Sequence, residues 1–227
     1  ANPLIIVLGI LLSFYLDNMV ERNNKIEYKN FVIKNLKMIL IEDLSNIEKI
    51  KSLQNDCYIA CETLINDIKD GKIDLSEKEI ATNYLLISQN GWTSFFPQNS
   101  TYDELISTGS MEIISSVNFR KSLTNTYTHL YERNLQISRT IDDFFLMSNS
   151  KLGPHFVIEY GTKQDEGYIY DDLVPISSNI DKEFYLSNTA ISDLLQAKKL
   201  IGNYLNLLEE YENSYLKLQL HAEEEIN

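Results

Sequence analysis

The chain has 227 residues and a net charge of −13, and this length is enough for one domain with a substantial core. Because the excess of acidic side chains repels phosphate backbones, we expect no nucleic-acid partner. Only 8 Gly and 4 Pro are present, which argues against a chain of many tight turns and favours an all-α fold.

The N-terminal stretch is apolar and carries no charge before Asp17. A helix of roughly 16 residues spans ~24 Å, which is shorter than the ~30 Å hydrocarbon core of a bilayer. The sequence opens at Ala1 rather than at a methionine, so we expect the apolar segment to continue upstream. We predict a membrane-spanning segment over 1–20, with a buried core helix as the alternative. Its apolar residues are Leu4, Ile5, Ile6, Val7, Leu8, Ile10, Leu11, Leu12, Phe14 and Leu16.

Gly9 and Ser13 lie four residues apart within this stretch and therefore on one helix face. A pair of small residues at this spacing lets two membrane helices approach closely, so the pair favours self-association within the bilayer. The alternative is that Gly9 is simply a residue common in membrane helices.

A single long helix of about 65 residues is predicted to continue from the apolar stretch as far as Gly71. The segment between Asp17 and Asp70 contains no Gly or Pro, and its apolar residues recur in steps of three and four. Cys57 and Cys61 lie one turn apart in it, and we expect them to be two packed apolar side chains rather than half of a zinc site.

A second helix is predicted to end near Asn90-Gly91, with Asp74 and Ser76 as possible N-caps and with Glu77 and Glu79 in its first turn. An aromatic loop comes next, and it is either an exposed recognition tip or the plug at one end of a helical bundle. Its aromatic residues are Trp92, Phe95 and Phe96.

Two further helices complete the predicted bundle. Thr101 and Glu104 have the spacing of a capping box for a short helix, and Asn118 is the expected cap of a long helix from Phe119 to about Ser150. Residues 151–187 have little helical periodicity and are predicted to be an irregular aromatic loop. The last helix is expected from Asn188 to near the end. We predict an elongated four-helix-type bundle over 21–227.

No catalytic signature is present in the sequence. Phosphate-binding, dinucleotide-binding, zinc-protease and serine-hydrolase motifs are all missing. His129, His155 and His221 are scattered, without the repeated Glu-x-x-His pairs of di-iron bundles. We therefore expect no cofactor, no metal and no enzymatic activity, and we regard a hydrolase built from the carboxylates of the 155–187 loop as a remote alternative.

The segment from IIVLGILLSFYLDN onward, with TYDELISTGS later in the chain, resembles an uncharacterised bacterial family of membrane-anchored proteins, a domain-of-unknown-function family. The matching residues are Gly9-Ile10-Leu11 and Thr101-Tyr102-Asp103-Glu104-Leu105 with Ser107, Thr108 and Gly109. The chain departs from the family at 17–21, where the family's tryptophan is missing. The resemblance implies a single-pass protein of the bacterial inner membrane with a periplasmic domain. The five basic residues that follow the apolar stretch favour the opposite topology; they are Arg22, Lys25, Lys29, Lys34 and Lys37.

These observations predict a membrane-anchored, non-enzymatic interaction or sensing protein whose helical domain is coupled to the bilayer by a continuous helix. Its expected partners are the lipid bilayer and either another protein or a second copy of the chain. The alternative function is an oligomeric pore or membrane-perturbing effector, in which Gly9 and Ser13 pack several copies together.

Overall fold

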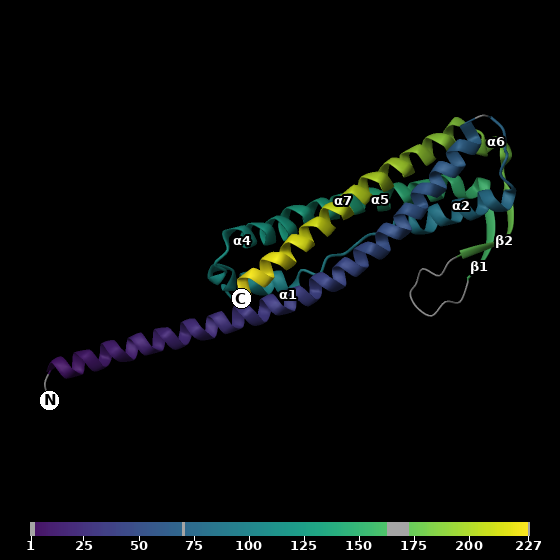
Figure 1. Cartoon of the computed structure of the whole chain (residues 1–227). Coiled ribbons are helices and arrows are strands. Elements are labelled where there is room, and N and C mark those ends of the chain that lie inside the picture. Colours follow the sequence, from purple (N-terminus) through teal and green to yellow (C-terminus); the bar gives the residue numbers. More distant parts are fainter. Residues whose placement is uncertain (1–2, 70, 163–172, 227) are drawn as a thin grey trace. The chain divides into compact units, whose positions relative to one another are not determined.

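The computed structural model describes residues 3–69, 71–162 and 173–226, with side chains for residues 6–69, 71–161 and 173–226. The described chain is mostly helical and contains one two-stranded sheet (Figure 1). The helices and strands, in order, are α1 (Pro3–Lys69), α2 (Glu77–Asn90), α3 (Ser100–Ser107), α4 (Val117–Thr124), α5 (Tyr131–Leu152), β1 (Phe156–Thr162), β2 (Leu173–Ile180), α6 (Lys182–Tyr185) and α7 (Asn188–Ile226).

The chain divides into two compact units, to which both α1 and α7 contribute. Unit 1 comprises residues 1–44, 97–130 and 213–227, and unit 2 comprises residues 45–96 and 131–212.

Helix α1 confirms the predicted long helix. It ends just before Gly71, which has a φ of +66° and donates its N–H to the carbonyl of Ile68, as expected of a glycine that terminates a helix. Among the helices that the structure describes, none is both long enough and apolar enough to cross a membrane, so the predicted membrane-spanning helix is not supported.

The core of unit 1 contains buried apolar side chains of α1, α4 and the end of α7. The buried apolar residues that α1 contributes are spaced three or four positions apart, so they form one stripe along the helix. The predicted long helix from Phe119 is interrupted, because a π-helical segment over Asn125–Leu130 separates α4 from α5. The cap of α4 is Ser116 rather than Asn118, since the Ser116 hydroxyl accepts the N–H of Phe119.

The predicted capping box at the start of α3 does not form. Asn99 is the N-cap residue and makes no side-chain cap hydrogen bond. The carboxylate of Glu104 instead accepts the hydroxyl of Tyr28, a residue of α1 in the same unit. Because α3 begins at Ser100, Thr101 lies inside the helix and is not its N-cap.

In unit 2, α2 begins as predicted. Ser76 and Glu79 form a complete capping box, with the Ser76 N–H donating to the Glu79 carboxylate at 2.8 Å. The core of this unit contains Cys57 and Cys61 of α1 and large aromatic side chains of α5 and α7. The prediction that both cysteines are packed apolar side chains is confirmed.

The prediction of an irregular loop over 151–187 is wrong in its described parts. Helix α5 continues to Leu152, and β1 and β2 form an antiparallel pair in which Phe156 lies opposite Ile180, with a bulge between Glu159 and Tyr160. Residues 163–172 of the predicted loop lie outside the described part of the chain. The sheet packs beside α2, where the Phe156 ring stacks on Tyr84 at 4.4 Å between ring centroids.

Candidate functional site

The predicted membrane-facing residues lie along the first turns of α1. Within unit 1, Figure 1 shows this end of the helix extending past the elements that pack against α1 further along. The side chains of Leu4 and Ile5 are outside the described part. The other eight are 51–64% exposed, and they are Ile6, Val7, Leu8, Ile10, Leu11, Leu12, Phe14 and Leu16. No described atom lies within 4 Å of a Cβ added at Gly9, and Ser13 is exposed.

The aromatic loop after α2 contains both of the arrangements that the sequence allowed. Phe95 is only 2% exposed and packs edge-on against Tyr211, so it is the plug. Trp92 and Phe96 are 49% and 71% exposed. The two outer aromatic residues therefore remain available for recognition, while the middle one fixes the loop to the core of unit 2.

Three buried polar side chains hold this loop in place. The Gln54 amide donates to the carbonyl of Asn90 at 3.0 Å and to that of Thr93 at 2.8 Å. The Asn134 amide donates to the carbonyl of Phe95 at 2.8 Å, and the Phe95 N–H donates to the hydroxyl of Tyr204 at 2.6 Å. The loop backbone is thus fixed from α1, α5 and α7, as a preorganised binding loop requires.

A hollow of about 160 Å³ lies at the outer face of the loop. Its floor and walls combine aromatic rings, hydroxyl-bearing residues and one carboxylate of α5, and the residues are Trp92, Thr93, Ser94, Phe96 and Asp142. Partial burial, followed by the neighbouring Asp143 charge, raises the pKa of Asp142. The aromatic residues of this site are predicted from the sequence, whereas the acidic pair of Asp142 and Asp143, on α5, is expected from the sequence to be an ordinary solvated pair.

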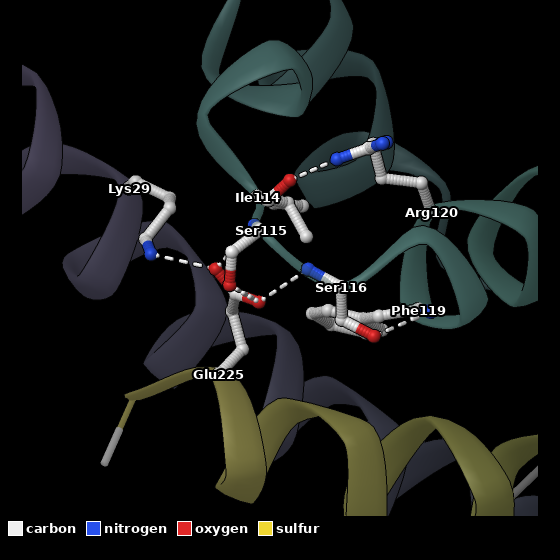
Figure 2. A network of polar contacts seen from close by, with 7 residues as sticks. All are labelled: Lys29, Ile114, Ser115, Ser116, Phe119, Arg120 and Glu225. Atoms are coloured by element: carbon white, nitrogen blue, oxygen red, sulfur yellow. Dashed lines mark hydrogen bonds and ion pairs between the residues drawn. The ribbon is translucent and has the colours of Figure 1, made fainter.

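A second polar arrangement lies in unit 1 at the end of α7 (Figure 2). The Glu225 side chain is 1% exposed, and its carboxylate accepts the Lys29 ammonium at 2.8 Å. It also accepts the N–H groups of Ser115 and Ser116 at 2.8 and 3.0 Å, and the Ser115 hydroxyl at 2.9 Å. We call these four residues the Glu225 clasp.

The clasp stabilises the ionised form of its carboxylate. Burial raises the pKa of Glu225, but the hydrogen bonds from Lys29, Ser115 and Ser116 outweigh it and lower that pKa to about 2. The clasp joins α1, the segment before α4 and the end of α7 within unit 1. The sequence does not predict the clasp, because the C-terminal acidic cluster gives no sign of which carboxylate is buried or with which lysine it pairs.

Other buried polar groups and thiols lie in the cores of the two units. Asp43, buried in unit 1, accepts the Tyr215 hydroxyl at 3.0 Å and the Gln98 N–H at 3.1 Å, and burial raises its pKa. Burial also raises the pKa of the Cys61 thiol to about 12 and that of Cys57 further still. Within the described residues, no group of three His, Cys, Asp or Glu side chains is placed to hold a metal ion.

The described chain is thus a mostly helical protein with exposed apolar side chains at the N-terminal end of α1 and in the loop after α2. The family model described as "Family of unknown function (DUF6090)" matches residues 3–160. The chain belongs to this family. No curated protein and no solved structure matches the chain.

Proposed function

We propose that this protein is a membrane-attached, non-enzymatic interaction or sensing protein, tethered through the apolar N-terminal end of α1. The observation that carries the proposal is the exposure of that end: eight described apolar side chains between Ile6 and Leu16 face outward, and no charge occurs before Asp17. Exposed apolar surface of this extent is typical of a site that another apolar phase covers.

Energetics support a bilayer as that phase. Moving an exposed large apolar side chain out of water is worth roughly 1.5–3 kcal/mol when burial is complete. Several such side chains on successive turns of one helix therefore supply enough free energy to hold the helix end in lipid. The tether would place unit 1, whose Glu225 clasp includes Lys29 of the same helix, next to the membrane surface.

A non-enzymatic role is proposed because the sequence contains none of the familiar catalytic motifs, whereas the aromatic loop offers a fixed surface for recognition. For the same membrane attachment we propose the inner membrane of a bacterium, with the helical units on the periplasmic side. The resemblance of the span and of the TYDEL segment to membrane-anchored relatives supports this placement.

Vesicle flotation tests the tether. The full chain is mixed with vesicles of phosphatidylethanolamine and phosphatidylglycerol and centrifuged through a density gradient. We expect the protein to float with the vesicles, and we expect Leu12→Asp to reduce the floating fraction strongly, because an acidic residue within a membrane-inserted helix costs about 2.5–3.5 kcal/mol. Ser45→Asp is the matched control, since it adds the same charge at an exposed position further along α1.

Two results would overturn the tether: failure of the unaltered protein to float, or equal flotation of the Leu12→Asp and Ser45→Asp variants. Topology needs a separate probe, because Cys57 and Cys61 are buried and cannot report on access. Glu209→Cys introduces an exposed thiol. In cells with a permeabilised outer membrane, we expect an impermeant maleimide to label it, and labelling only after lysis of the inner membrane would contradict the periplasmic placement.

A further inference from the structure

The hollow beside the aromatic loop has the chemistry of a cation-binding site. We propose that Trp92, Phe96 and Asp142 bind an alkylated ammonium group of a small molecule. The inference goes beyond the proposed function by naming a ligand class, and it does not depend on the tether. All five lining residues belong to unit 2.

The two aromatic side chains favour an organic cation. The faces of Trp and Phe rings carry negative electrostatic potential and attract a cation that lies within about 6 Å of the ring centroid. An alkylated ammonium ion also presents apolar methyl groups, so it loses little hydration on meeting the exposed rings. A small metal ion would lose strongly held water there, and the five lining residues contribute only one carboxylate to replace it.

Asp142 supplies the opposite charge. Asp142 lines the same hollow as Trp92 and Phe96, and Asp143 next to it adds to the negative potential. Partial burial raises the pKa of Asp142, and a bound cation would lower this pKa again because it stabilises the ionised carboxylate. The net charge of −13 attracts cations to the surface and disfavours an anionic ligand.

The hollow is also fixed before a ligand arrives. Gln54, Asn134 and Tyr204 hold the loop backbone, and the Trp92 indole N–H donates to the carbonyl of Gln89, which sets the plane of that ring. A volume of about 160 Å³ exceeds the ~30 Å³ share of one liquid water. The space therefore suits a compact head group such as trimethylammonium.

Intrinsic fluorescence tests the proposal directly, because Trp92 is the only tryptophan of the chain. The full protein, without vesicles, is titrated with choline chloride, with sodium chloride at the same ionic strength, and with 3,3-dimethylbutan-1-ol, the neutral analogue of choline. We expect a saturable change of emission with choline only. The flotation vesicles carry no trimethylammonium lipid, so the two experiments fail or succeed independently.

Four variants locate the site. We expect Asp142→Asn and Phe96→Leu each to weaken the apparent affinity for choline by roughly fivefold or more, since each removes a charge or a cation–π contact. Phe96→Tyr keeps an aromatic face and should retain binding. Asp143→Asn changes a neighbouring carboxylate outside the lining and should stay within about twofold of the unaltered protein.

Circular dichroism identifies any variant that fails to fold. Phe96 is highly exposed, so Phe96→Leu tests the site even if another variant is unstable. Three results would overturn the proposal: no saturable response to choline, an equal response to the neutral alcohol, or unchanged affinity in the Phe96→Leu variant.

Discussion

The Lys29 ammonium donates a 2.8 Å hydrogen bond to the Glu225 carboxylate, across a separation of 196 positions in the sequence. Both side chains are nearly inaccessible, at 8% and 1% exposed. Two buried charges are stable together only when their hydrogen-bonding capacity is filled, and the two backbone N–H groups and the hydroxyl of the clasp serve that purpose. Loss of either partner should therefore cost much more than loss of a surface ion pair.

Substitution of Glu225 tests this cost. Glu225→Gln leaves the Lys29 ammonium buried without its counter-charge, and we expect a loss of about 3–5 kcal/mol in the free energy of unfolding. Glu224→Gln is the control, because Glu224 is 75% exposed and lies 3.5 Å from His221, a surface contact worth about 0–1 kcal/mol. Urea denaturation measures both. Equal losses in the two variants would contradict a stabilising clasp.

Acid should weaken the clasp in a defined pH range. The pKa of Glu225 is lowered from 4.5 to about 2 in the folded protein, so the unfolded chain binds the proton more readily. The stabilisation is complete above pH 4.5 and is lost as the pH falls toward 2. We expect the difference in stability between the unaltered protein and Glu225→Gln to shrink over this range, and a difference that stays constant would rule out the assigned pKa.

Gly91 is predicted to be intolerant of a side chain. An added Cβ would overlap Cζ of Phe145 and would lie 2.6 Å from the backbone oxygen of Ile87. We expect Gly91→Ala to cost about 1–3 kcal/mol through overpacking and to alter the emission of Trp92 beside it. Gly153→Ala is the control, because nothing lies within 4 Å of its added Cβ. Similar thermal stability of the two variants would show that the contact is easily relieved.

Both cysteines should be unreactive in the folded protein. Cys57 and Cys61 are fully buried, and burial raises the pKa of each thiol, so little thiolate is present at pH 8. We expect Ellman's reagent to modify them slowly in buffer and rapidly in concentrated urea. Rapid modification without denaturant would mean that α1 opens locally near these residues.

Local sequence signals predicted the elements whose contacts are local. Ser76 and Glu79 are three residues apart and formed their capping box, and Gly71 ended α1 as expected. Thr101 and Glu104 carry the same signal, yet Tyr28, 76 positions away, takes the Glu104 carboxylate. The signal was equally strong in both cases, and only tertiary contacts distinguish them.

The aromatic loop and the hairpin depend on contacts with residues that are distant in the sequence. The presence of Trp92, Phe95 and Phe96 marked the loop, but which ring is buried depends on Tyr211, on another helix. Similarly, β1 and β2 contain too few alternating residues to stand out, and their pairing becomes favourable only with Tyr84 of α2 beneath Phe156. Long-range partners of this kind cannot be read from a single sequence.

A fluorophore at the N-terminal end of α1 tests membrane attachment most directly. Leu12→Cys is labelled with a nitrobenzoxadiazole fluorophore, which selects this thiol because both native cysteines are buried. On addition of phosphatidylethanolamine and phosphatidylglycerol vesicles, we predict a blue-shifted and stronger emission, while the same label at Glu209→Cys stays unchanged. Unchanged emission at position 12, at vesicle concentrations that bind a transmembrane control peptide, would contradict membrane attachment through α1.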